Sequence, residues 1–299
     1  MNSSPQPLTL TQTLSDRVFP SAVSSVSDWF TEWKPQMGLR HWQNGKSAKE
    51  LAKAWFPRDR GAEVPPGFLS LMRSSPVTSG LTIQSVTGEV KIPLDKGRAR
   101  ARHADLVLKC EAHNTPILIH VEAKCDEEFA QTCEDRWESA LRKEGPDSTL
   151  PNRMSRLCHL LFGTRDFARS LQNVPPRLRV LRYQLLYGAA GAILDAARQK
   201  VGVVVFIVHE LLPHDMSKPF LGDDGTARRL LDRKQIEENA LDFQRFVGAL
   251  TRDRVTQLPI GKLLDVGEFI PSVSDWLHLT ETTEVRLLIG KAFDVTQQI

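Results

Sequence analysis

Two apolar runs lie near the middle of the chain, Ala104–Glu111 and Pro116–Lys124, and only a short polar link separates them. Strand-length runs joined in this way predict a β-hairpin. The simplest connection is a symmetric two- or four-residue turn centred between His113 and Asn114. This turn determines which residues of the two strands face each other.

Antiparallel pairing about this turn places Asp105 opposite Glu122 and His103 opposite Lys124. Side chains alternate along a strand, so these four residues share one face of the hairpin with Val107, Lys109 and His120. The opposite face is continuously apolar and must pack on a core; it holds Ala104, Leu106, Leu108, Cys110, Ile117, Ile119, Val121 and Ala123. Two carboxylates in direct apposition lower stability unless a cation lies between them. The polar face is therefore more typical of a metal site than of a purely structural hairpin.

The segment before the hairpin predicts a helix followed by extended chain. The helix lies within residues 41–56, where Ser47 is the expected N-cap and Glu50 completes a capping box. Alternating apolar positions then predict strands over Leu81–Val86 and Glu89–Leu94, or one bent strand across both. A basic link, residues 96–103, leads into the hairpin; it is either a solvated loop or a surface that contacts phosphates.

The segment after the hairpin begins with a polar helical insertion, about residues 129–175, with helices expected at Thr132–Lys143 and Arg153–Phe162. A strong 3.6-residue apolar stripe predicts a long helix over Arg177–Gln199, in which Gly188 and Gly191 indicate close approach to the sheet. The β-branched run Val201–Val208 predicts a central strand covered on both faces.

Near the C-terminus, an amphipathic helix over Lys234–Leu250 precedes two final strands, about Ile260–Leu264 and Val285–Gly290. The core order is therefore α-β-β-β-α-β with extra C-terminal strands. This order predicts an α/β fold with a mixed central sheet flanked by helices. We expect one domain over residues 36–299, preceded by a flexible tail, residues 1–35, that carries a short docking helix near Val26–Trp33.

Composition excludes several classes of protein. The 299 residues are 41% apolar and 25% charged, with a net charge of only +3, so any nucleic-acid affinity must come from a local patch. No apolar run is long enough to cross a bilayer, and the N-terminus lacks the features of a secretory signal. Four cysteines without a CxxC pair favour free thiols in the cytoplasm. A zinc site is an open alternative, with ligands from Cys125, Cys133, Cys158 and His159.

Asp105 followed by Glu122-Ala123-Lys124 resembles the D…(D/E)-x-K signature of the PD-(D/E)XK nuclease superfamily. Ala104 stands where a proline often precedes the aspartate in that superfamily. Longer strings, SAKELAKAWF, VEAKCDEEF, LRYQLLYGAA and GKLLDVGEF, resemble a bacterial subgroup of unassigned function within it. The likeness spans roughly Trp42 to Lys291. It implies a restriction-endonuclease-like core with the motif on its second and third strands.

The resemblance also implies a site and a reaction. Asp105, Glu122 and the carbonyl of Ala123 would hold Mg²⁺ or Mn²⁺, and Lys124 would position the attacking water or balance phosphate charge. Two further residues would assist. Glu50 is the candidate from the helix before the sheet, with Glu63 as its rival, and Gln184 is the candidate from the helix after it; Tyr187 follows Gln184 at three residues, where some relatives have a tyrosine at four.

The expected function is that of a metal-dependent phosphodiesterase that acts on nucleic acid, with DNA as the favoured substrate, and that has a role in bacterial defence. The alternative is a catalytically inactive protein of the same fold that binds nucleic acid or a protein partner. A third reading is a structural hairpin with solvent-facing charges. The choice between DNA and RNA, the cleavage mode and the oligomeric state are not determined by the sequence, which shows no marker of a homo-oligomeric interface.

Overall fold

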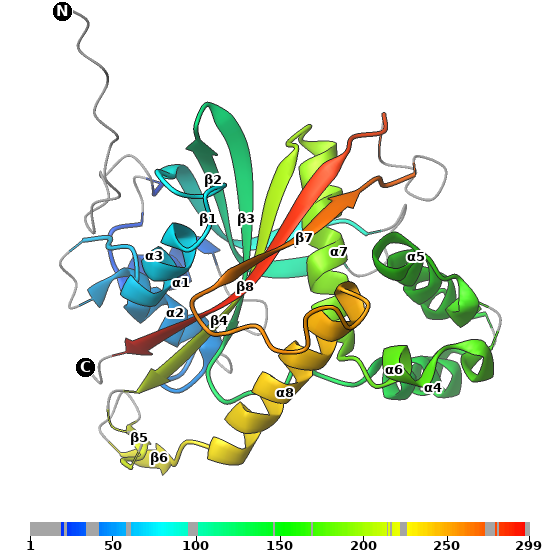
Figure 1. Ribbon diagram of the computed structural model, residues 1–299. Helices are drawn as coiled ribbons and strands as arrows, with labels where there is room; N and C mark the ends of the chain where they lie inside the picture. Colours follow the sequence, from blue (N-terminus) through cyan, green and yellow to red (C-terminus); the bar gives the residue numbers. More distant parts are fainter. Residues whose placement is uncertain are drawn as a thin grey trace, which may run out of the picture.

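A computed structural model describes residues 19–20, 23–33, 42–57, 61–94, 101–145, 147–168, 170–213, 215, 217–221, 226–272, 279 and 281–296. Its centre is a six-stranded mixed sheet in the order β1-β2-β3-β4-β8-β7 (Figure 1). The strands are β1 (Thr82–Ile92), β2 (Arg102–Ala112), β3 (Thr115–Lys124), β4 (Val203–Pro213), β7 (Leu263–Phe269) and β8 (Val285–Thr296). β1, β2 and β3 are antiparallel, β3, β4 and β8 are parallel, and β7 is antiparallel to β8. The predicted α/β class with a mixed, helix-flanked sheet is confirmed.

The β2–β3 hairpin has the predicted symmetric register, from Ala112 opposite Thr115 to Leu106 opposite Val121. His113 and Asn114 form its two-residue turn with φ angles of 51° and 61°. Two positive φ angles define the type I′ turn, whose twist matches that of the flanking strands. Asp105 and Glu122 are the next positions beyond the last pair of this ladder.

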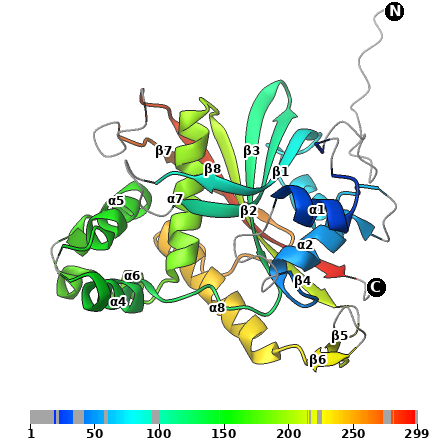
Figure 2. The same cartoon turned by 180° about the vertical axis from the view of Figure 1, so that it is seen from behind.

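Helices cover both faces of the sheet (Figures 1 and 2). One face packs on α1 (Val26–Trp33), α2 (Ser47–Trp55) and α3 (Pro66–Arg73), and the apolar hairpin residues from Leu106 to Ala123 point into this core. The other face packs on α7 (Tyr183–Arg198) and α8 (Arg233–Leu250). β4 contributes alternate residues to both cores, as predicted for a central strand covered on both faces.

The helical insertion lies beside α7 as a separate group of helices (Figure 2). It contains α4 (Cys133–Glu144) and α5 (Leu150–Phe162), followed by short 3-10 helices η3 (Asp166–Ala168) and η4 (Leu171–Asn173). The Thr132 side chain caps α4 by accepting a hydrogen bond from the backbone N–H of Asp135 at 3.1 Å. α5 packs on the apolar core that α7 shares with the sheet. The insertion is therefore attached beside the pocket described below.

Several predicted elements differ from the structure in their extent. Of the two alternatives predicted for residues 81–94, the structure has the single bent strand, β1, with an irregularity between Ile83 and Ser85 and a positive φ of 51° at Glu89. β4 and β8 are longer than predicted because their polar ends pair inside the protein: His209 lies 2.9 Å from Asp294. A small sheet of β5 (Phe220–Leu221) and β6 (Ala227–Arg229) follows β4.

The long helix predicted over Arg177–Gln199 is wrong at its start. Residues Pro176–Arg179 form a separate short helix, α6, and α7 begins only at Tyr183. Between them the backbone pairs with the start of the insertion, since Leu181 accepts from Cys133 N–H at 2.8 Å and Tyr183 N–H donates to Gln131 at 3.0 Å. These backbone groups are consequently not used for a continuous helix.

The two glycines of α7 lie against the sheet as predicted. A Cβ atom at Gly188 would lie 2.7 Å from Cζ of Phe206 on β4. A Cβ atom at Gly191 would lie 2.8 Å from Cδ of Arg102 on β2. Only glycine permits this approach without moving a neighbour, and the approach brings α7 close to the polar ends of β2 and β3.

The docking helix expected near Val26–Trp33 is α1, and its Trp29 is buried in the core beside α2. Residues 1–18 and 95–100, which include most of the predicted tail and of the basic link, lie outside the described residues. Among the helices that the structure describes, none is long and apolar enough to span a membrane.

Candidate active site

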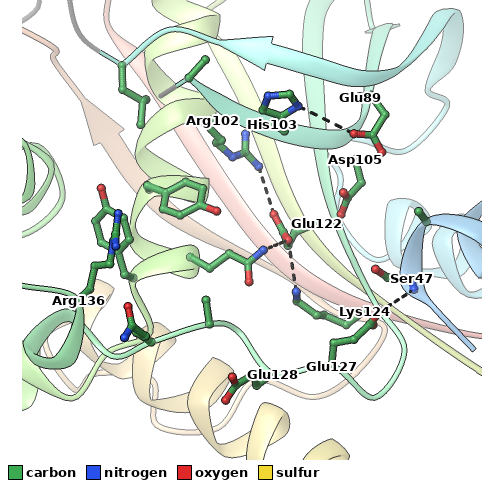
Figure 3. Close-up of a pocket in the computed structure, with 18 of the residues that line it drawn as sticks. Ser47, Glu89, Arg102, His103, Asp105, Glu122, Lys124, Glu127, Glu128 and Arg136 are labelled. Atoms are coloured by element: carbon green, nitrogen blue, oxygen red, sulfur yellow. Dashed lines mark hydrogen bonds and ion pairs between the residues drawn. The ribbon is translucent and has the colours of Figure 1, made fainter. Parts of the chain in front are cut away.

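A pocket of about 600 Å³ opens where the ends of β2 and β3 meet α7 and the insertion (Figure 3). Its charged and polar lining comes from every neighbouring element. These residues are Ser47, Glu89, Arg102, His103, Asp105, Glu122, Lys124, Glu127, Glu128, Gln131, Arg136, Arg153, Tyr183, Gln184 and Tyr187. The structure thus brings together Asp105, Glu122, Lys124 and Gln184, four of the residues singled out in the sequence.

Asp105 is bonded to the backbone of the neighbouring strand. Its Oδ2 accepts a hydrogen bond of 2.6 Å from the N–H of Ala123. The N–H and C=O of one strand residue point toward the same edge, so the Ala123 carbonyl faces the Asp105 side as well. Burial and the nearby Glu122 carboxylate raise the pKa of Asp105 well above its usual value. The two carboxylates therefore repel each other inside the pocket, as the hairpin register predicted.

Glu122 is buried and receives three polar contacts. The Gln184 side chain donates a hydrogen bond from Nε2 to Glu122 Oε1. Lys124 Nζ lies 3.6 Å from the same oxygen, and Arg102 Nη2 lies 4.0 Å from Oε2. Burial raises the pKa of Glu122, while Lys124 and Arg102 act in the opposite direction. The surrounding donors hold the carboxylate in one orientation at the base of the pocket (Figure 3).

Lys124 is 6% exposed, and its ammonium lies 5.3 Å from the ring centroid of Phe129. A cation at this distance over an aromatic face is attracted by the ring quadrupole. Together with the contact to Glu122, this places the ammonium within the pocket rather than in solvent.

Arg102 is a site residue that the sequence reasoning assigned only to a basic link. Its side chain is buried, and its Cζ lies over the Phe206 ring, 5.6 Å from the ring centroid. Its Nη1 lies 3.2 Å from Nδ1 of His120. A guanidinium only donates, so Nδ1 of His120 must accept and the ring proton lies on Nε2. Nε2 is 3.3 Å from Asp195 Oδ2 on α7. A buried row of polar groups thus leads from Glu122 into the protein.

This row has no local sequence signal. His120 alternates with Glu122 on β3 and was placed on the correct face, but its partners come from β2 and from the C-terminal half of α7. The one available hint was Gly191, whose missing side chain leaves room for Arg102. Tyr187, which follows Gln184 at three residues instead of four, also lines the pocket; burial and then the Glu122 charge raise its pKa above the usual value.

Glu50 does not line this pocket. Its Oε1 accepts from Gly45 N–H at 2.9 Å and from Lys53 Nζ at 3.1 Å, and its Oε2 accepts from the Thr296 hydroxyl at 2.5 Å. The capping box is also wrong: Lys46 is the N-cap, and Ser47 uses its backbone N–H to bond Glu127 at 3.1 Å. The bonds from Ser47 to Glu127 and from Thr296 to Glu50 are long-range contacts that the local pattern does not contain.

Glu63, the rival to Glu50, does not line the pocket either. Its backbone N–H donates to the carbonyl of Trp55 at the end of α2. In the part of the chain that the structure describes, the carboxylates that line the pocket beside the hairpin pair are instead those of Glu89, Glu127 and Glu128.

The residues suit a hard divalent cation with few protein ligands. In the described ranges no cluster of three or more His, Cys, Asp or Glu side chains could hold a metal, so an ion would rely on two carboxylates, a backbone oxygen and water. Mg²⁺ is commonly bound in this way. The mutual repulsion of Asp105 and Glu122 is what a bound cation would relieve.

The cysteines do not gather into the alternative zinc site. Cys133 and Cys158 lie in the core beneath α7, whereas Cys125 packs in a separate cluster with Leu212, Phe220 and Leu231. Burial raises the thiol pKa of both Cys133 and Cys158. In the described residues these side chains form no group of three or more that could hold a metal ion.

The fold and pocket define a mixed α/β protein with a buried, polar site at the end of a β-hairpin. The chain belongs to the family described as "Domain of unknown function (DUF6946)", whose model matches residues 22–289. Comparisons with curated proteins and with solved structures found no match.

Proposed function

We propose that the protein is a divalent-metal-dependent nuclease that hydrolyses phosphodiester bonds in DNA. The observation that carries the proposal is the convergence of Asp105, Glu122 and Lys124 on one pocket, with the Ala123 backbone at the same edge. The resemblance of these residues to the PD-(D/E)XK signature supports it. So does the succession α2, β1, β2, β3, α7, β4, with the motif on the second and third strands.

Phosphodiester hydrolysis needs an activated water and neutralisation of charge on the phosphorus centre. Asp105, Glu122 and the Ala123 carbonyl would hold Mg²⁺ or Mn²⁺, which would supply Lewis acidity and a more acidic water. Lys124 is the one ammonium that lines the pocket within the described residues, and it would orient the water or balance the phosphate charge. Gln184 and Arg102 would keep the Glu122 carboxylate in place.

The test is cleavage of supercoiled plasmid and of single-stranded DNA in Mg²⁺ or Mn²⁺, with EDTA as the metal-free control. Lys124→Ala and Glu122→Ala should each abolish cutting. Lys109→Ala is the matched control, because Lys109 lies on the same face of the hairpin but is exposed to solvent. Undiminished cutting by both pocket variants would refute the assigned roles. If the wild-type protein binds DNA but does not cut it, the alternative function, a catalytically inactive binding protein of the same fold, is favoured.

A further inference from the structure

The pocket wall that faces the Asp105 and Glu122 carboxylates carries positive charge, and the proposed hydrolysis does not use this charge. Arg136 on α4, Arg153 on α5 and Tyr183 at the start of α7 line this wall. Figure 3 shows Arg136 across the pocket from Asp105 and Lys124. Both arginines come from the helical insertion, so this wall is built by a different part of the chain from the catalytic hairpin.

The acidic groups of the pocket have cationic neighbours. Glu127 lies 3.9 Å from Lys46 and Glu128 lies 3.7 Å from Arg182. Arg136 differs from them. Among the residues that the structure describes, its half-buried guanidinium has no hydrogen-bond acceptor and no carboxylate partner.

Arg153 and Tyr183 form the inner part of this wall. Arg153 is 9% exposed and is hydrogen-bonded to the Tyr183 hydroxyl. Burial raises the pKa of Tyr183 to about 12, so the hydroxyl keeps its proton and is able to donate. The wall therefore presents two guanidinium groups and a hydroxyl donor, which is a donor set for an anion.

We propose that Arg136, Arg153 and Tyr183 bind a second phosphate of a single nucleic-acid strand, adjacent to the phosphodiester held at Asp105, Glu122 and Lys124. This assignment rests on the proposed nuclease function. Planar guanidinium groups bind phosphate oxygens through paired hydrogen bonds. A pocket of about 600 Å³ lies within the usual range of small-ligand sites, so it has room for a short stretch of one strand beside the hairpin.

The bound group is either an internal phosphodiester or a terminal phosphate, since both present the same oxygens. The experiment separates them. Binding of short fluorescent thymidine oligonucleotides is measured by anisotropy in EDTA, where metal-dependent cleavage is absent. Each internal phosphate is replaced in turn by a neutral methylphosphonate, and a second series compares 5′-phosphate with 5′-hydroxyl ends.

The proteins compared are wild type, Arg136→Gln, and Arg142→Gln as the matched control. Arg142 lies on the same helix, is exposed and does not line the pocket. A methylphosphonate at one position of the oligonucleotide should weaken binding to wild type and to Arg142→Gln about tenfold. The same methylphosphonate should change binding to Arg136→Gln less than twofold. Should Arg136→Gln not fold, Arg136→Lys takes its place, because it keeps the charge but loses the paired hydrogen bonds.

Coupling at one internal position supports the subsite with a phosphodiester ligand, and coupling only in the 5′-phosphate series supports it with a terminal phosphate. Equal penalties in all three proteins, or no binding by wild type, would overturn the subsite. The cleavage assay is independent of this result. A protein that cuts DNA but shows no coupling retains the nuclease function and lacks the subsite. A protein that shows coupling but does not cut DNA has the subsite and lacks the nuclease function.

Discussion

Gln184 on α7 donates its side-chain amide to the Glu122 carboxylate on β3, across 62 residues of sequence. The bond joins the helix that follows the insertion to the hairpin that precedes it. It also leaves Glu122 with one oxygen facing Lys124 and the other facing Arg102. The orientation of the central carboxylate is thus set by two other strand residues and one helix residue.

Replacing Gln184 with alanine should lower metal-dependent cleavage by about tenfold to a hundredfold, the usual effect of removing a group that orients a metal ligand. The melting temperature should change little because Gln184 is only half-buried. Cleavage rates across a Mg²⁺ titration provide the measurement, with Gln172→Ala, an exposed glutamine on η4, as the control. A variant as fast as wild type at every Mg²⁺ concentration would show that the bond does not matter for the site.

Arg102→Met should lower the free energy of unfolding by about 3–5 kcal/mol, because it leaves Glu122 as a buried carboxylate with a weaker cationic environment. Arg102→Lys should not restore this loss, since a lysine does not reproduce the fork that reaches both Glu122 and His120. Urea unfolding measures both variants beside Arg142→Met, which removes an exposed arginine. A loss below about 1 kcal/mol would mean that the buried row of polar groups is not structural.

Asp195 should make stability depend on acid pH. His120 and Arg198 lower its pKa to about 2, against the opposing effect of burial, while the unfolded value is 3.8. A lowered pKa in the folded state gives stability that is present above pH 3.8 and is lost as the pH falls toward 2. This contribution is about 2 kcal/mol near neutral pH.

The measurement for Asp195 is the difference in unfolding free energy between wild type and Asp195→Asn at pH 7, 4 and 3. The difference should be largest at pH 7 and should narrow at the two lower values. A difference that stays constant or widens as the pH falls would contradict the lowered pKa.

Glu50→Gln should affect stability rather than metal use. Its carboxylate is bonded to Lys53, Gly45 and Thr296 away from the pocket, and loss of the buried charge leaves Lys53 with a weaker partner. The expected destabilisation is about 1–3 kcal/mol, with the Mg²⁺ concentration for half-maximal cleavage unchanged. A tenfold rise in that concentration would instead place Glu50 at the metal.

Local patterns were sufficient for the elements whose signals are short-range. Alternation of apolar residues and the two-residue turn at His113–Asn114 predicted the β2–β3 register, and with it the apposition of Asp105 and Glu122. The β-branched run before His209 predicted the central strand β4. In each case the residues that determine the geometry lie within a few positions of one another.

The predictions were wrong at positions where contacts between distant parts of the chain determine the structure. The interruption of the predicted helix before Tyr183 depends on backbone pairing with Gln131 and Cys133, which lie about 50 residues earlier in the sequence. Glu50 accepts a hydrogen bond from Thr296 at the opposite end of the chain as well as from Gly45 beside its own helix N-terminus.

The sequence by itself determined the hairpin, its register and the face that carries Asp105, Glu122 and Lys124, because strand alternation and turn geometry are local properties. Only the tertiary structure decided that Arg102 is buried beneath Glu122, that Gln184 reaches it and that Arg136 lines the opposite wall. These side chains come from β2, α7 and α4, and their meeting depends on how α7 and the insertion pack against the sheet. Packing of this kind is cooperative over the whole core, so no short segment of sequence encodes it.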